Sequence, residues 1–196
     1  FEAHAQVGSS TDPEQVAGIN DSELVKALAR LHPQDSWDWA RALVEHIRQR
    51  AGLLVEREPG VFTFPHRTFQ EYLAGVHLAL GPNFISTAVK LAESGAFWRE
   101  VILLAVGYKV HSQGEHDLTL GLVNALCPLR KPVNEADWRK IQLAGDALLE
   151  MGLSRVERQE EGKELLDRVR ERLTELVEQG RLSPVERAQV GEVLGL

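Results

Sequence analysis

The feature that most constrains the fold of this chain is a short break in an otherwise helical pattern. Residues 53–56 and 61–64 are β-prone, and the stretch Arg57-Glu58-Pro59-Gly60 separates them. Pro-Gly suits the two central positions of a type II turn, because proline presets φ at the first and glycine accepts the positive φ of the second. The pattern predicts one small β-hairpin set between helices.

Two helical segments precede the hairpin. Asn20 can cap the first, with Glu23 three residues later, and Pro33 ends it. Asp35 or Ser36 can cap the second, which runs to Gly52 and carries apolar residues four apart. Its apolar stripe comprises Trp39, Ala40, Leu43, Val44, Ile47 and Ala51. Helices followed by a hairpin predict a winged-helix arrangement.

A third helix, over residues 68–80, follows the hairpin and stops at Gly81-Pro82. The residues predicted on its buried side are Phe69, Tyr72, Leu73, Val76 and Leu80. Beyond Pro82 only helical patterns recur, among them a helix capped by Asn134 and a capping box at Ser183. Their short connections favour HEAT-like stacking, although no regular repeat aligns.

The fold class is therefore mainly α. A flexible segment is expected over residues 1–19, a winged-helix domain with a small β-hairpin over 20–80, and an all-α, HEAT-like helical domain over 81–196. The 196 residues are enough for one large or two small domains. Because the chain starts at Phe1 and opens on a polar, Gly-rich stretch, we interpret it as a piece of a longer protein.

Composition narrows the functional classes. The net charge of −7, from 22 basic and 29 acidic residues, gives no positive field that would recruit nucleic acid or anionic lipid. No apolar run approaches the roughly 18 residues of a membrane span. The single cysteine, Cys127, excludes an internal disulfide and fits a cytoplasmic setting. We expect no membrane partner and no nucleic-acid partner.

The strongest candidate for a functional residue is His66. It lies at a Pro-His corner between the second β run and the following helix, within Phe64-Pro65-His66-Arg67-Thr68-Phe69-Gln70-Glu71-Tyr72-Leu73-Ala74. A histidine beside the free amides of a helix N-terminus can help hold an anion such as phosphate. The alternative is a histidine that caps the helix or fills a polar corner. Arg67 can face phosphate too, or stand exposed at the helix start.

This run resembles a signature of NACHT-type STAND NTPases, the family of bacterial anti-phage sensors and animal NLR proteins. Arg50-Ala51-Gly52-Leu53-Leu54-Val55 is similar to the helix-to-wing entry of that family. The resemblance implies that His66 senses the β-phosphate of ADP held by an upstream nucleotide-binding domain. It further implies ADP or ATP with Mg²⁺ in the parent protein, a downstream sensor or effector domain, homo-oligomerisation on activation, and a role in signal transduction or antiviral defence.

Catalytic parts are not expected in this region. A P-loop needs G-x-x-x-x-G-K-[ST], and the only Gly-Lys pair, Gly162-Lys163, is followed by Glu164. We therefore predict a regulatory and scaffolding region that is not itself an enzyme and holds no cofactor alone. The alternative is a winged-helix DNA-binding transcriptional regulator. Possible metal ligands gather over residues 111–117, without the helical spacing of a zinc motif.

Overall fold

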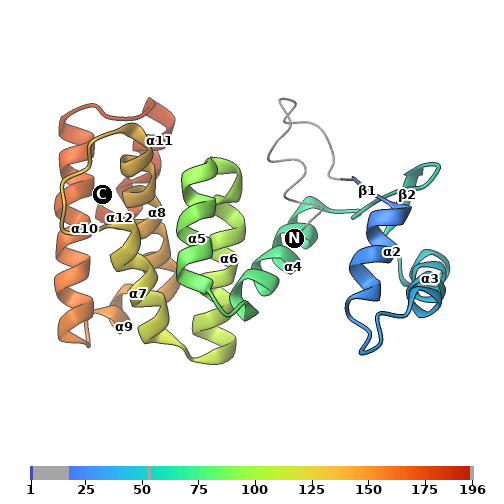
Figure 1. Cartoon of the computed structure of the whole chain (residues 1–196). Coiled ribbons are helices and arrows are strands. Elements are labelled where there is room, and N and C mark those ends of the chain that lie inside the picture. Colours follow the sequence, from blue (N-terminus) through green and yellow to red (C-terminus); the bar gives the residue numbers. More distant parts are fainter. Residues whose placement is uncertain (2–17, 53, 195–196) are drawn as a thin grey trace. The chain divides into compact units, whose positions relative to one another are not determined.

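The computed structural model describes residue 1, residues 18–52 and residues 54–194. These residues divide into two compact units, Phe1–Ala74 and Gly75–Leu196. Figure 1 shows that strands occur in the first unit, whereas the regular elements described in the second unit are all helical. The fold is a winged-helix domain followed by a helical domain, as the sequence predicts.

The sheet of the first unit has three antiparallel strands in the order β1-β3-β2. Its strands are β1 (Gly18–Asn20), β2 (Val55–Glu58) and β3 (Val61–Thr63). The predicted hairpin is present, and Gly60 at its turn has a φ of 77°, a conformation in which glycine carries no steric penalty. This hairpin is the wing.

Strand β1 was not predicted. It lies at the end of the segment expected to be flexible over residues 1–19, of which residues 2–17 fall outside the described ranges. Ile19 is its single apolar residue and pairs with Phe62 of β3. Three residues are too short to show the alternation that marks a strand, so only the pairing with β3 reveals it.

Helix α2 (Asp21–Ala29) begins at the predicted cap, because Asn20 Oδ1 accepts the backbone N–H of Glu23 at 2.9 Å. Helix α3 (Trp37–His46) is capped by Ser36, whose hydroxyl accepts the N–H of Trp39. It continues as a π-helical turn, η1 (Ile47–Ala51). Gly52 ends this turn in the left-handed region, with a φ of 56°.

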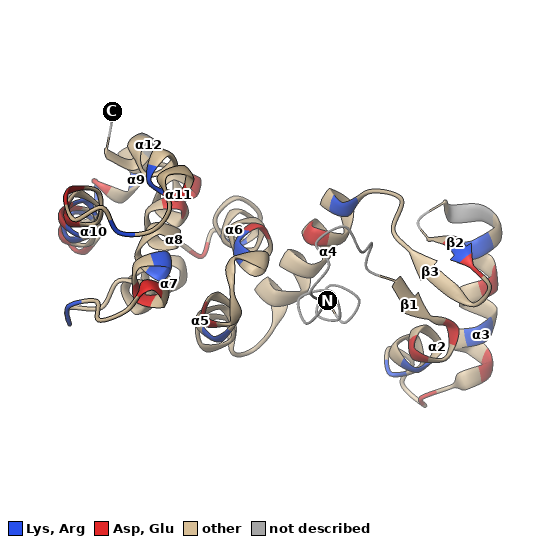
Figure 2. Cartoon of the chain, turned by 90° about the horizontal axis from the view of Figure 1, so that it is seen from above, with Lys and Arg blue, Asp and Glu red and all other residues tan. Residues whose placement is uncertain are grey.

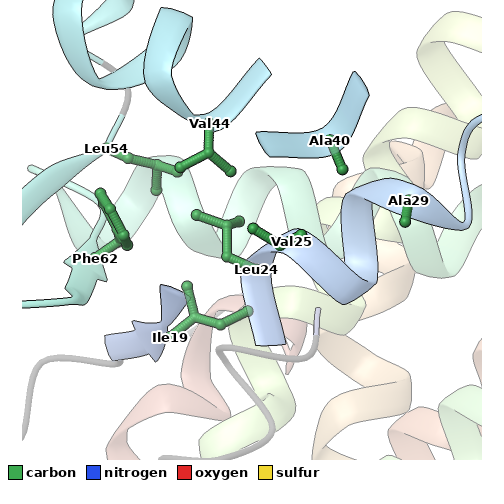
Figure 3. Packing of buried hydrophobic residues seen from close by; sticks show 8 residues of the cluster. All are labelled: Ile19, Leu24, Val25, Ala29, Ala40, Val44, Leu54 and Phe62. Atoms are coloured by element: carbon green, nitrogen blue, oxygen red, sulfur yellow. The ribbon is translucent and has the colours of Figure 1, made fainter. Parts of the chain in front are cut away.

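The core of the first unit lies between α2, α3 and the sheet, as Figure 3 shows. Ile19, Leu24, Val44 and Phe62 converge there from four different elements. Phe62 is 2% exposed and is the largest of them. Each element therefore contributes apolar surface that it could not bury alone, and their shared burial stabilises the winged helix.

Helix α4 (Arg67–Leu80) departs from expectation in the face that it buries. The apolar stripe predicted as buried is largely exposed, with Tyr72 at 44% and Leu80 at 60%. Its buried residues are Gln70, Glu71, Ala74, Gly75, Leu78 and Ala79. Gly75 permits a close approach to α6, since a Cβ there would lie 3.0 Å from the carbonyl oxygen of Val101. The helical period correctly identified which residues form the apolar stripe. The prediction that this stripe is buried within the chain was wrong.

The second unit packs its helices side by side (Figure 1). The α-helices that follow α4 are α5 (Phe84–Ser94), α6 (Arg99–Gly107), α7 (His116–Leu126), α8 (Glu135–Met151), α9 (Leu153–Val156), α10 (Glu160–Glu178), α11 (Pro184–Gln189) and α12 (Gly191–Leu194). Two short turns of other helix types are η2 (Ala96–Trp98) and η3 (Tyr108–Gln113). Helix α8 contacts α5, α6, α7 and α10 and is buried along most of its length.

Candidate functional site

His66 is exposed at the start of α4, one residue before the helix begins. Its carbonyl accepts the backbone N–H groups of Phe69 and Gln70, at 3.2 and 3.4 Å. These are the bonds that open the helix, so His66 directly precedes the first-turn amides of α4. The first turn of α4 contains no acidic residue. The corner can therefore favour an anion through the positive end of the helix dipole.

Aromatic packing braces the corner from both sides. Phe64 packs against the domain core before the turn, and its ring centroid lies 6.1 Å from that of Phe69 after the turn. The chain from β3 into α4 is therefore clamped around Pro65 and His66. Such bracing holds the backbone at the corner, which fixes where the His66 side chain leaves the chain.

An open depression of about 440 Å³ lies beside the imidazole. Its walls are formed by Pro65, His66, Thr68, Phe69 and Tyr72. Of these, only His66 was singled out as a site residue from sequence; Pro65, Thr68, Phe69 and Tyr72 were not. Their positions in the first turns after the corner were the available signal, because residues one turn apart share a helix face.

Arg67 is held by a neighbour on the same helix. Its Nε donates to Glu71 Oε1 at 2.8 Å, and the side chain of Glu71 is only 7% exposed while that of Arg67 is 63% exposed. This pairing has the i, i+4 spacing of helical ion pairs and could have been found from sequence. Arg67 is thus an exposed residue at the helix start whose guanidinium is already engaged by a buried carboxylate.

The other candidate residues lie apart from the corner in sequence and have partners of their own. His111 Nε2 lies 3.2 Å from the carbonyl oxygen of Glu150, and His116 Nε2 lies 3.4 Å from Arg155. Within the described ranges, no group of three or more His, Cys, Asp or Glu side chains is placed to hold a metal ion. The structure does not bring residues 111–117 together as a ligand set.

Charge on the winged helix is mixed rather than basic, as Figure 2 shows. Arg48, at the end of the second helical segment, forms ion pairs with Glu56 of the wing and Glu45 of α3. A guanidinium engaged by two carboxylates offers little to a DNA phosphate. The arrangement does not favour the DNA-binding alternative.

Comparison with known families identifies the class of the first unit. Residues 13–78 match the family model described as a winged helix-turn-helix domain C-terminal to NACHT. The matched range includes the wing, the His66 corner and nearly all of α4. The match is to a winged helix associated with NACHT proteins, a domain distinct from the catalytic NTPase domain.

The match supports placing the chain in the C-terminal part of a NACHT-type protein, and the resemblance seen in the sequence is confirmed. No curated protein and no solved structure matches the chain. Among the described helices, none combines the length and the apolar character needed to cross a bilayer.

Proposed function

We propose that this region restrains a nucleotide-binding domain located upstream in the same NACHT-type protein, with His66 donating a hydrogen bond to the β-phosphate of ADP bound there. The observation that carries the proposal is the exposure of His66 at the braced N-terminus of α4. The ADP or ATP and its Mg²⁺ belong to the upstream domain, and this chain contributes the sensing group.

The chemistry of the corner suits a phosphate. An imidazole N–H bond to a phosphate oxygen is strengthened by the negative charge of that oxygen. The positive end of the α4 dipole also attracts the phosphate, and the first turn of α4 contains no acidic residue that would repel the phosphate. Arg67 can add long-range attraction, but a direct contact would require it to leave Glu71.

The exposed stripe of α4 supports a docking role for the same surface. Phe69 and Tyr72 stand in the depression beside His66, and Leu73 and Leu80 continue the apolar face along the helix. We infer that the upstream domain covers this face when ADP is bound, because burying such side chains contributes about 25 cal/mol per Å². Contact at His66 and burial of the stripe would then stabilise one restrained state together.

Helix α4 also suggests how nucleotide state reaches the helical domain. Its first part belongs to the first unit, whereas Gly75 to Leu80 belongs to the second and Gly75 touches α6. A helix that contributes to both units can transmit a change at His66 to the helical domain. We propose that this domain passes the change to a downstream sensor or effector.

The test uses the NACHT-type protein with its upstream domain present. His66→Ala should raise the off-rate of a fluorescent ADP analogue about tenfold, since one charge-assisted hydrogen bond contributes about 1.5 kcal/mol. His77→Ala, which changes another exposed histidine of α4, is the matched control. Equal off-rates for His66→Ala and the unmodified protein would eliminate the sensor role.

A further inference from the structure

A groove in the second unit shares no residue with the site described above. It runs between the end of α7, the loop over residues 127–134 and the outer side of α10, with a volume of about 610 Å³. The lining residues are Asn124, Leu129, Glu161, Glu164, Leu165, Asp167, Arg168, Glu171 and Arg172. Leu129 is exposed and Leu165 is buried, so the groove combines one accessible leucine with a charged rim.

The rim is dominated by a row of carboxylates on α10. Glu161, Glu164, Asp167 and Glu171 follow one another at three- and four-residue spacing and are all exposed. Within the described part of the chain none of the four takes part in an ion pair. Like charges at this spacing destabilise a helix by about 0.2–0.5 kcal/mol per pair. The helix dipole of α10 stabilises Glu161, which lies in the first turn. It does not stabilise the other three carboxylates, which lie further along the helix.

The two arginines of the groove do not neutralise this row. Arg168 Nη2 donates to Asn124 Oδ1 at 2.5 Å. Arg172 Nη1 donates to Glu175 Oε2 at 3.0 Å, and only 11% of the Arg172 side chain is exposed. The Asn124 amide is neutral, so Arg168 keeps its positive charge in the groove, whereas Arg172 is paired with Glu175. Four carboxylates against two guanidinium groups still leave the rim with an excess of negative charge.

Leu129 gives the groove a fixed apolar contact at its edge. It is 80% exposed although its loop is held by side-chain hydrogen bonds. Asp137 anchors that loop by accepting two hydrogen bonds from Arg130 and one from the backbone N–H of Val133. Because hydrogen bonds already hold the loop, little conformational entropy is lost when a partner covers Leu129.

We propose that this groove binds a basic amphipathic helix of a partner protein. Its Lys or Arg side chains would meet the carboxylate row of α10, and its apolar side chains would cover Leu129. The row from Glu161 to Glu171 spans about 15 Å, the length of roughly three helical turns. Charge selects this occupant: a second copy of a chain with a net charge of −7, or a nucleic acid, would be repelled.

The test is fluorescence anisotropy with the whole chain and a labelled amphipathic peptide of about 12 residues made of Lys and Leu. We expect binding that weakens with salt and an absence of binding for the same peptide with Glu in place of Lys. Glu164→Gln combined with Glu171→Gln should weaken binding about tenfold, as expected for two charge contacts. Leu129→Ser should weaken it as well.

Matched controls separate a groove from general attraction to an acidic protein. Glu160→Gln combined with Glu178→Gln changes the net charge equally on the same helix but outside the groove, and should leave binding unchanged. Val185→Ser removes another strongly exposed apolar side chain, outside the groove, and should leave binding unchanged. Equal losses for both glutamate pairs, or no binding of the Lys/Leu peptide, would overturn the proposal.

Discussion

Arg130 and Asp137 face each other across the turn into α8, joined by two parallel hydrogen bonds of 3.0 Å each. The carboxylate also accepts the N–H of Val133 and lies 3.2 Å from the Lys140 ammonium. One buried acid therefore closes the loop before α8 and anchors the first turn of the central helix of the second unit.

This pairing predicts a clear cost for Asp137→Asn. The amide keeps the shape of the side chain but loses the charge that satisfies Arg130 and Lys140, so we expect the free energy of unfolding to fall by about 2 kcal/mol. Urea denaturation followed by circular dichroism measures the change. Asp117→Asn is the matched control, because Asp117 lies exposed in the first turn of α7 and should cost less than about 1 kcal/mol. Equal costs would contradict the anchoring role.

A pH dependence follows from Glu186, which holds α11 in place. Hydrogen bonds from Ser183, with a further one from Arg139, lower the pKa of Glu186 to about 2. The unfolded value is about 4.3, so the stabilisation is complete above that pH and is lost as pH falls toward the folded value. Glu186→Gln should therefore be less stable than the unmodified chain at about pH 6, with a gap that narrows by about pH 3.

The same urea titrations at each pH provide the measurement. Glu178→Gln serves as the control, since Glu178 is exposed at the end of α10 and lines none of these contacts. Its stability relative to the unmodified chain should change little with pH. A gap for Glu186→Gln that stays constant through acid would show that the ionised carboxylate contributes nothing to the docking of α11.

Two phenylalanines on either side of the His66 corner should lose different amounts of stability on truncation. Phe62 is 2% exposed in the core of the winged helix, whereas Phe69 is 37% exposed on α4. Phe62→Ala should destabilise the first unit by about 3–5 kcal/mol, because it removes contacts and leaves a cavity. Phe69→Ala should cost less than about 1.5 kcal/mol in this chain. Thermal unfolding of the two variants distinguishes these outcomes, and similar losses would place Phe69 in the core.

Phe69 also shows where sequence reasoning reaches its limit. The 3.6-residue period of α4 identifies an apolar stripe, and the caps at Asn20, Ser36, Asn134 and Ser183 are all found where predicted. Caps depend on residues three positions apart, so local sequence specifies them. Which face a helix buries depends on distant parts of the protein. In α4 the stripe is exposed, while Glu71 is buried with Arg67 as its partner.

Strand β1 and the surroundings of His66 could not be predicted for the same reason. Ile19 becomes part of a strand only by pairing with Phe62, far along the chain. The position of His66 at a helix start was predictable from the Pro-His corner, but the bracing of that corner by Phe64 and Phe69 depends on how the rings pack. Short-range patterns fix where an element begins, and long-range packing decides what it contacts.

Gly162 is the glycine of the only Gly-Lys pair in the chain, and its surroundings assign it a packing role. A Cβ at this position would lie 2.4 Å from the backbone carbonyl oxygen of Val156, an atom that cannot move aside as a flexible side chain can. Gly162→Ala should therefore force α9 and α10 apart and lower the unfolding free energy by about 2 kcal/mol.

Gly121→Ala in α7 is the control, since its Cβ would meet only the end of the Ile85 side chain at 3.1 Å. Alanine there gains about 1 kcal/mol of helix propensity, which offsets the contact. If urea denaturation finds the two variants equally stable, close approach of α10 to α9 is not what requires this glycine.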